Sequence, residues 1–385
     1  MSLQIRRRGP TLALVTLSLV LAVAYARPVL SLPTYAARTG LDCRTCHFDP
    51  NGGGPRNAFG FLYSKQRHDL APDPDPRWAE LAVSNTFGDV LFVGTNTRLV
   101  YLGMGTLETT ELSTFFHMQG ALDVTLQPHP SLAIVMVRDF GEFSGDVTRD
   151  LYGLLQDGGA NYYVKAGRIR GVFGLRQDDH TAGTRGGFLN TPAGGTGGLL
   201  PYDPRTATSG IEAGVFRGGV AFAASLTNGA TAFANKAQAV SAKLTHQVPY
   251  GRLGFSIYDD YETSSGRRST RWSGYGLARV PGTPDLTFQG EVGFGTDDLG
   301  NGEKRNLLAT YIQSDYRISR TFIVRARYDF SDVFRSTPGN ASERFAVEGE
   351  ATLVPFADLR LGYREIVPET SGNEHRVLGM FHFYY

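Results

Sequence analysis

The sequence has very little cysteine, almost no net charge and no long apolar run beyond its first 26 residues. Two cysteines allow at most one disulfide. A formal net charge of +1 gives no signal for binding polyanions, and no basic helix or nucleic-acid motif is present, so we expect no nucleic-acid partner. The missing apolar runs exclude membrane-spanning helices in the mature chain. Motifs for a catalytic nucleophile, a phosphate-binding loop or a zinc site are also missing.

Residues 1–26 are typical of a secretory signal peptide. A basic stretch at Arg6-Arg7-Arg8 precedes an apolar stretch from Thr11 to Ala22, and Ala24 and Ala26 form a small-residue cleavage site. Removing this segment changes the formal net charge from +1 to about −2. We therefore expect an exported protein whose mature chain starts near residue 27.

The overall composition favours one large barrel over several soluble domains. A chain of 385 residues would usually form two or three domains, but this one combines 47 glycines with 18 tyrosines and 24 phenylalanines. In a membrane β-barrel, an apolar outer face and a polar lumen average to a mildly hydrophilic sequence, and glycine serves the many turns.

From residue 88 onward, apolar and polar residues alternate with a period of two. In the clearest segment, Phe322, Val324 and Tyr328 occupy one face, while Arg325 and Arg327 occupy the other. This alternation predicts sixteen strands, near residues 88–102, 111–127, 131–141, 148–156, 160–171, 208–217, 219–227, 238–248, 251–261, 269–280, 285–295, 305–318, 321–331, 343–354, 357–366 and 374–385.

The predicted connections alternate between tight turns and longer polar loops, one of which extends over about residues 173–207. Short periplasmic turns and long outer loops are typical of bacterial outer-membrane barrels, as is an aromatic residue such as Tyr385 at the end of the last strand. The fold class is therefore predicted as all-β, a transmembrane antiparallel β-barrel of about 16 strands over residues 83–385. A large soluble all-β protein is the alternative.

Residues 27–82 form a short irregular segment rich in proline and glycine. One helix is predicted between Asn57, as its cap, and Asp69. The segment is too small to build an apolar core of its own. To fold, the segment must pack around a haem, against the inside of the barrel, or both.

The sequence Cys43-Arg44-Thr45-Cys46-His47 lies in this segment. Cys-x-x-Cys-His is the attachment signature of haem c, in which two thiols bond the haem vinyl groups and the adjacent imidazole coordinates the iron. The spacing predicts a monohaem cytochrome c-like segment in which Cys43 and Cys46 hold one covalent haem and His47 is the proximal iron ligand. A Cys43–Cys46 disulfide is the alternative, although no βαβ pattern surrounds it.

The sixth iron ligand is less clear from the sequence. His68 is the first choice, because no other His or Met besides His47 lies in the irregular segment. An equally good interpretation is that His68 is an ordinary solvated histidine without a bound metal. Met380 and His382 are predicted to face the lumen near the periplasmic mouth. His117 is predicted in the lumen near the outer end and Met118 on the lipid side. An open sixth position is a further alternative.

Three consecutive predicted strands place charged residues of both signs in the lumen. We expect them to form a structural network along the pore. A more specific interpretation is that they bind the haem propionates or narrow the channel. These residues are Arg325, Arg327, Glu348, Glu350, Arg360 and Arg364.

The N-terminal segment resembles the outer-membrane fused monohaem c-type cytochrome–porins, which include iron-oxidising outer-membrane cytochromes. The similarity rests on Tyr35-Ala36-Ala37-Arg38-Thr39-Gly40, on the haem motif and on Pro55-Arg56-Asn57-Ala58-Phe59-Gly60. The turn Asp49-Pro50-Asn51-Gly52-Gly53-Gly54 departs from the family pattern. The resemblance implies one haem c, a barrel of about sixteen strands and electron transfer across the outer membrane.

The expected function is electron transfer between an extracellular donor or acceptor, with Fe(II) as one candidate, and a periplasmic c-type cytochrome. If the protein is catalytic, it would be an Fe(II):cytochrome oxidoreductase. The expected location is the outer membrane of a Gram-negative-type cell, in contact with its lipid, with the haem segment on the periplasmic side or in the lumen. The alternative is a diffusion porin whose haem segment is a plug, sensor or docking element.

Overall fold

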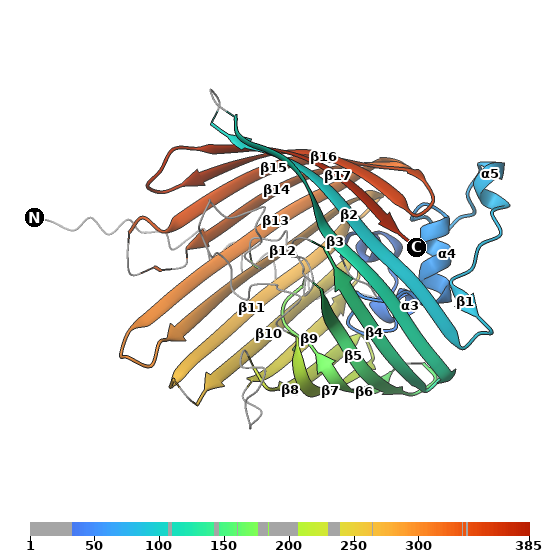
Figure 1. Cartoon of the computed structure of the whole chain (residues 1–385), viewed down its shortest axis with the longest axis horizontal. Helices are drawn as coiled ribbons and strands as arrows, with labels where there is room; N and C mark the ends of the chain where they lie inside the picture. Colours follow the sequence, from blue (N-terminus) through green and yellow to red (C-terminus); the bar gives the residue numbers. More distant parts are fainter. Residues whose placement is uncertain are drawn as a thin grey trace, which may run out of the picture.

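The computed structural model describes residues 33–106, 110–141, 146–159, 161–175, 184, 207–229, 239–263, 265–332, 334–335 and 338–385. The predicted signal peptide, residues 1–26, lies outside this part. Strands β2 to β17 form a closed barrel, with the N-terminal helices at one of its ends (Figure 1). The strands are β2 Leu91–Gly105, β3 Thr110–His129, β4 Leu132–Phe140, β5 Val147–Gln156, β6 Tyr162–Ile169, β7 Thr208–Arg217, β8 Val220–Thr227, β9 Ala239–Val248, β10 Gly251–Glu262, β11 Arg267–Val280, β12 Thr283–Asp298, β13 Lys304–Ser319, β14 Phe322–Asp332, β15 Ala341–Val354, β16 Ala357–Pro368 and β17 Glu374–Tyr384.

Each strand pairs antiparallel with the next one along the chain, so the sheet is an up-and-down meander. The barrel closes where β17 pairs with β2, from His375 opposite Gly105 to Tyr384 opposite Asn96. A short extra strand, β1 (Thr86–Phe87), lies beside the start of β2. All sixteen predicted strands are confirmed, with ends that differ by a few residues.

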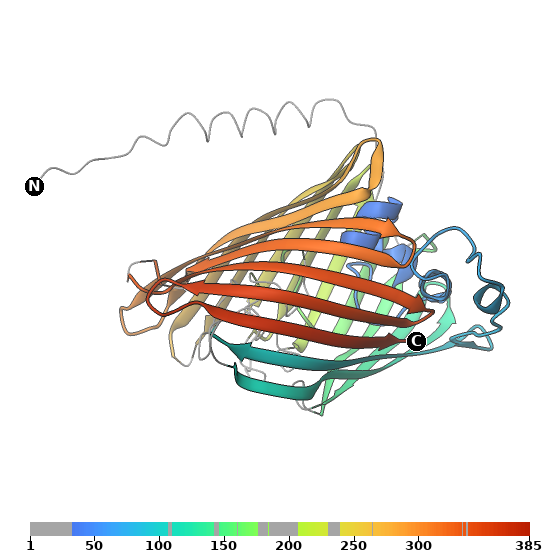
Figure 2. The same cartoon turned by 90° about the horizontal axis from the view of Figure 1, so that it is seen from above.

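The predicted alternation of connection lengths is also confirmed. Two residues separate β7 from β8, β9 from β10, β11 from β12, β13 from β14 and β15 from β16, whereas residues 170–207 separate β6 from β7. We refer to the two ends of the barrel as the short-turn end and the loop end. The C terminus and the N-terminal helices both lie at the short-turn end (Figures 1 and 2).

The two faces of the wall differ as the alternation predicts. On β14, Arg325, Arg327 and Asp329 are buried on the inner face, while Phe322 on the outer face is 38% exposed. Large apolar side chains such as Val347 and others on nearly every strand are exposed on the outer face. In water, such a continuous apolar surface would drive aggregation, but in lipid it is the favourable arrangement.

The N-terminal segment contains four short helices, α2 (Pro33–Thr39), α3 (Cys43–Cys46), α4 (Ala58–Lys65) and α5 (Pro76–Ala79). Helix α2 packs against β11 and β12 inside the barrel. Figure 2 shows the first helices within the short-turn end and α5 outside it. None of the helices in the described ranges is long and apolar enough to cross a membrane.

The helix predicted from Asn57 to Asp69 is confirmed only as far as Lys65. Asn57 is its N-cap, as predicted, and its side chain accepts a hydrogen bond from the Gly60 N–H. The helix ends because Arg67 and His68 have positive φ values of 53° and 59°. These left-handed conformations turn the chain back toward the lumen.

The prediction that the Met118 side chain lies on the lipid side of the wall is wrong. A bulge interrupts the pairing of β2 with β3, because Arg98 lies opposite Gln119 while Leu99 lies opposite His117. Met118 is the extra residue of the bulge and is only 2% exposed. It packs with Val100, Leu102, Leu378 and Met380. His117 was expected in the lumen but lies opposite Leu99, whose side chain is exposed on the outer face.

Candidate functional site

The haem motif forms a single helical turn, α3. The His47 N–H donates to the Cys43 carbonyl oxygen at 2.9 Å, which closes the turn and places the side chains of Cys43, Cys46 and His47 around one cavity. Both thiols are free. Cys43 packs in a buried cluster with Ala37, Leu175, Tyr275, Leu277 and Tyr311.

Helix α4 packs very closely against α3. The Asn57 N–H donates to the Cys46 carbonyl oxygen at 3.1 Å, and a Cβ on Gly60 would lie 2.1 Å from that same oxygen. Only glycine therefore fits at this point of α4. The Pro-Arg-Asn-Ala-Phe-Gly sequence, which carries part of the family resemblance, thus has a structural role: it holds α4 against the haem motif.

All four predicted site residues, Cys43, Cys46, His47 and His68, line one cavity of about 360 Å³ in the lumen of the short-turn end. Three consecutive glycines with positive φ, Gly52 to Gly54, form part of its wall. Gly52 approaches the Cys43 sulfur so closely that an added Cβ would lie 2.9 Å from it. The cavity is within the size range of cofactor sites in proteins.

His47 has a fixed ring orientation. Its Nδ1 lies 3.3 Å from the Gly54 carbonyl oxygen. Because a carbonyl oxygen only accepts, Nδ1 carries the proton in this contact, and the neutral ring then has its lone pair on Nε2. Metal-bound histidines commonly donate their other N–H to a backbone carbonyl in this way.

His68 is 7% exposed and lies between aromatic rings. Its ring centroid is 4.1 Å from that of Tyr35 and 5.1 Å from that of Tyr384, which is nearly parallel to it. Its Nδ1 has no hydrogen-bond partner among the described residues. Burial lowers the pKa of His68 to about 4, so the imidazole is neutral at physiological pH and keeps a lone pair for a metal ion.

Two other candidates for the sixth ligand, Met380 and His382, also line the cavity, as the sequence predicted. His382 is partly engaged, because its Nε2 lies 3.1 Å from Asn96 Oδ1, while its Nδ1, 3.5 Å from Asp358 Oδ2, makes no hydrogen bond to the described residues. Met380 is packed in the apolar cluster that contains Met118. Of these side chains, His68 is therefore the best placed to bind an added iron.

Burial raises the pKa of Cys43 to about 12 and that of Cys46 to about 11. Both groups are therefore neutral thiols at physiological pH. A redox-active Cys-x-x-Cys pair needs an accessible thiol with a lowered pKa. The arrangement does not suit the disulfide-exchange alternative.

Arginines outnumber acidic residues on the cavity wall. Six arginines line it, against the carboxylates of Asp42, Glu348 and Asp358. The arginines are Arg56, Arg98, Arg325, Arg327, Arg360 and Arg364. Four of these arginines already pair with carboxylates, namely those of Asp315, Asp329, Glu348 and Glu350, so only part of the excess is left for the two propionates of a haem.

Five of the six lumen charges predicted from three strands form one network, while Arg327 pairs with Asp329 on its own strand at 2.8 Å. Arg325 contacts Asp315 at 2.5 Å, Glu348 at 3.3 Å and Glu350 at 3.5 Å. Arg360 and Arg364 extend it, with distances of 2.7 Å to Glu350 and 2.6 Å to Glu348. Tyr35 of α2 donates to Glu350 at 3.0 Å, so the network also holds the N-terminal segment.

No role was predicted for the turn Asp49–Gly54, which departs from the pattern of the family that the segment resembles. In the structure this turn anchors the segment to the wall. Lys165 on β6 lies 2.8 Å from Asp49 Oδ2 and 3.0 Å from Glu212 on β7, and all three are inside the barrel. Asn51 donates to Glu212 at 2.7 Å and to Tyr163 at 2.8 Å. The only sequence signal for this anchor was Lys165 itself, a charged residue at an inward-facing position of β6.

Other anchors hold the segment around the circumference of the short-turn end. Thr34 donates to Asp315 on β13 at 2.9 Å, and Asp69 accepts from Arg317 at 2.8 Å. Phe61 of α4 stacks on Phe356, which lies between β15 and β16. The segment therefore acts as a plug for this end of the lumen, and we use the word plug for residues 33–85.

The start of the connection between β6 and β7 also enters the lumen. The Gly174 N–H donates to Ser256 at 2.8 Å, and Val172 and Phe173 are at most 1% exposed. Leu175 reaches the cluster around Cys43. The rest of this connection, except Thr184 and Ala207, lies outside the described residues. The plug and this connection meet beside the haem motif.

No family model and no curated protein matches the sequence of this chain. Among solved structures, an anion-selective porin from Comamonas acidovorans has a TM-score of 0.59 at 8% identity, covering 77% of this chain and 99% of that porin. OmpF of Salmonella typhi, in a complex with daunomycin, has a TM-score of 0.58 at 8% identity, over 77% and 97%. The channel DcaP of Acinetobacter baumannii has a TM-score of 0.54 at 11% identity, over 77% and 97%. The chain thus has the fold of the 16-stranded porins.

Proposed function

We propose that this protein is an outer-membrane monohaem cytochrome–porin that carries electrons through the lumen of its barrel. The observation that carries the proposal is that Cys43, Cys46, His47 and His68 line one cavity inside a porin-like barrel. The apolar outer face of the wall supports a position in the outer membrane, with the short-turn end toward the periplasm.

Each of the four residues has a separate task. Cys43 and Cys46 would bond the haem, and His47 and His68 would be the side chains that hold its iron. When bound, haem c takes up and releases one electron at a time. Guanidinium groups on the cavity wall would donate hydrogen bonds to the propionates, and the rings of Tyr35 and Tyr384 enclose the His68 imidazole.

The position of the cavity explains the use of a barrel. The hydrocarbon core of a membrane is about 30 Å thick, and electrons do not tunnel efficiently over such a distance. A redox centre within the lumen shortens the gap between an extracellular donor or acceptor and a periplasmic c-type cytochrome. Either direction of electron flow is allowed, and Fe(II) is a candidate donor.

The test uses the purified full-length chain in liposomes that contain an oxidised soluble c-type cytochrome. Fe(II) held by a large, impermeant chelator is added outside. The proposal predicts that each Fe(II) loses one electron to become Fe(III) and that one internal cytochrome is reduced for each. The rate should fall to background in His47→Ala liposomes, and equal rates in both would contradict the proposal.

A second candidate function is favoured by the fold comparison. The similar solved structures include porins, one of them anion-selective, and arginines also line the lumen cavity of this chain. In that case the protein is a diffusion porin, and its N-terminal segment is a plug, sensor or docking element. Liposome swelling separates the two functions. Free swelling in small sugars together with a haem that Fe(II) does not reduce favours the porin.

A further inference from the structure

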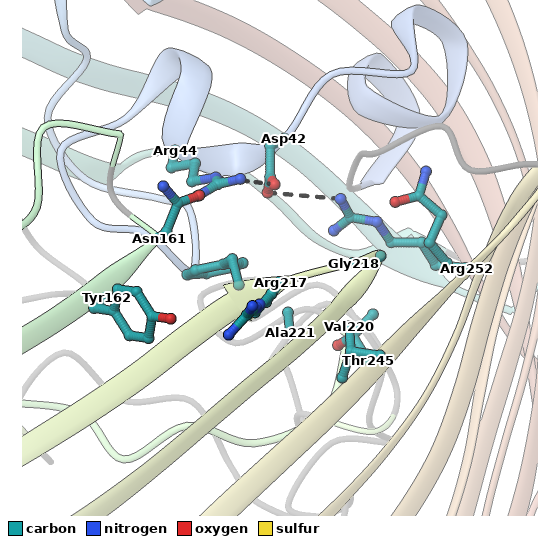
Figure 3. Close-up of a pocket in the computed structure, with 13 residues that line it drawn as sticks. Asp42, Arg44, Asn161, Tyr162, Arg217, Gly218, Val220, Ala221, Thr245 and Arg252 are labelled. Carbon is teal, nitrogen blue, oxygen red and sulfur yellow. Dashed lines mark hydrogen bonds and ion pairs between the residues drawn. The ribbon is translucent and has the colours of Figure 1, made fainter.

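A second cavity lies at the short-turn end, between the plug and the barrel wall (Figure 3). It has a volume of about 330 Å³. Asp42 and Arg44, which flank Cys43, form its plug side. Arg217 at the end of β7, Gln247 on β9 and Arg252 on β10 lie on its wall side. Of these residues, only Asp42 also lines the cavity of the proposed haem site.

The buried amide of Gln247 is the most informative group in this second cavity. Its side chain is 5% exposed, and neither the amide oxygen nor the amide nitrogen has a hydrogen-bond partner among the described residues. Buried polar groups are nearly always paired, with protein, water or a bound ligand. The amide offers one strong acceptor and two donors, so its partner both donates and accepts.

The charges around this amide favour an anion. Three arginines line the cavity against one carboxylate, that of Asp42. Arg44 is held in place, 3.1 Å from Asp42 and 3.1 Å from Asn161, with its guanidinium over the Phe216 ring. Arg252 is 4% exposed and forms a longer ion pair with the same carboxylate, its guanidinium nitrogen lying 3.6 Å from Asp42 Oδ1 (Figure 3).

We infer that this cavity binds a phosphate group. Hydrogen phosphate accepts hydrogen bonds from the guanidinium groups of Arg217 and Arg252 and from the Gln247 amide N–H. Its hydroxyl donates to the Gln247 carbonyl oxygen. A fully ionised carboxylate or sulfate accepts only and leaves the Gln247 oxygen unpaired. The phosphate comes either free from the periplasm or as the headgroup of a lipid whose glycerol hydroxyls act as the donor.

The test measures binding to the purified full-length protein in detergent by isothermal titration calorimetry. Inorganic phosphate is the first probe, and sodium sulfate and sodium chloride at equal ionic strength are the comparisons. Phosphate should bind at least about tenfold more tightly than sulfate, because of the hydrogen bond that sulfate does not make. Equal binding of sulfate and phosphate, or no binding beyond that of chloride, would overturn the inference.

Two variants locate the site, and one serves as a matched control. Gln247→Leu and Arg217→Gln should each weaken phosphate binding by about tenfold or more. Arg279→Gln changes the same residue type near the end of β11, outside the cavity, and should bind like the parent. Circular dichroism and heat-modifiable gel mobility confirm folding of each variant. Unchanged binding in both cavity variants would contradict the assignment.

A further arm separates the two sources of phosphate. Short-chain phosphatidylglycerol, added below its critical micelle concentration, competes with inorganic phosphate if the site takes a lipid headgroup. If inorganic phosphate binds and the lipid does not compete, the site takes free phosphate. Repeating the titration on the His47→Ala variant makes the result independent of haem, so failure here leaves the proposed electron transfer untouched.

Discussion

The barrel wall and the plug reach their structures by different routes. In the wall, each strand pairs with its neighbour in the chain, and the alternation of apolar and polar residues decides which face each side chain occupies. The plug has only four short helices, and contacts with distant strands hold it in place, such as Asp49 with Lys165 and Thr34 with Asp315. The wall is therefore stable to many local changes, whereas the plug depends on a few buried contacts.

The largest effect should come from a change that acts on the cofactor and spares the wall. Replacing His47 by alanine removes the proximal ligand, so the chain should lose covalent haem almost completely while the barrel still inserts. Haem staining of denatured chain on a gel, next to heat-modifiable mobility, measures both. His246→Ala, a change at an exposed position on β9, is the matched control and should keep its haem. Normal haem yield in His47→Ala would refute the site.

The second largest effect should come from the anchor of the plug. Lys165→Met leaves the buried carboxylate of Glu212 and the half-buried carboxylate of Asp49 without their shared cation, which should destabilise the docked plug by about 3–5 kcal/mol. We expect higher single-channel conductance in planar bilayers and faster proteolysis of the segment, because the plug spends more time undocked.

Lys304→Met is the control for this change. Lys304 forms an exposed ion pair with Asp298 at the loop end, 3.5 Å apart, and such pairs contribute at most about 1 kcal/mol. Conductance should match that of the parent. If both lysine variants behave alike, the buried cluster does not hold the plug.

A smaller effect should follow from crowding within the plug. Gly60→Ala places a Cβ against the Cys46 carbonyl oxygen, so α3 and α4 must separate slightly, at a cost of about 1–3 kcal/mol. Thermal unfolding followed through haem absorbance should show a lower midpoint. Gly153→Ala, on the wall, has nothing within 4 Å of the added Cβ and should leave that midpoint unchanged. The reverse ranking would contradict the close packing of α3 and α4.

The smallest effect concerns the ion pair between Arg67 and Asp73 within the plug. Hydrogen bonds from Arg67, at 2.5 and 2.7 Å, lower the pKa of Asp73 below its ordinary value. The pair therefore stabilises the plug above about pH 4, and this contribution is lost as the pH falls through the lowered pKa. Asparagine keeps an oxygen that accepts from Arg67 but loses the charge, so Asp73→Asn should make hydrogen exchange in the plug faster at pH 7, by the equivalent of about 1 kcal/mol.

The same measurement at low pH completes this prediction. At a pH low enough to protonate the Asp73 carboxyl of the parent, parent and variant should exchange at more similar rates. A difference that is equally large at both pH values would mean that the charge of Asp73 does not stabilise the plug.

The sequence predicted the wall well because its information is local. A period of two with turn residues at regular intervals places each strand and its faces without knowledge of the rest of the chain. The prediction failed at Met118, where a bulge adds one residue to β3 and shifts the alternation. No pattern in the residues around 117–119 reveals this extra residue.

The candidate site was predictable only as a motif. Cys43, Cys46 and His47 follow from their spacing, and their meeting with His68 in one cavity depends on the left-handed turn at residues 67 and 68. The roles of Gly60, Lys165 and Gln247 appear only once distant segments are brought together. Such contacts leave no periodic trace in the sequence.

The central claim is that a haem c is attached to the plug inside a folded barrel. It is tested most directly by purifying the full-length protein from cells that make c-type cytochromes and measuring haem on the chain after complete denaturation. The account predicts one covalently retained haem per chain, together with heat-modifiable mobility of the undenatured protein. A folded, heat-modifiable barrel that retains no haem would contradict it.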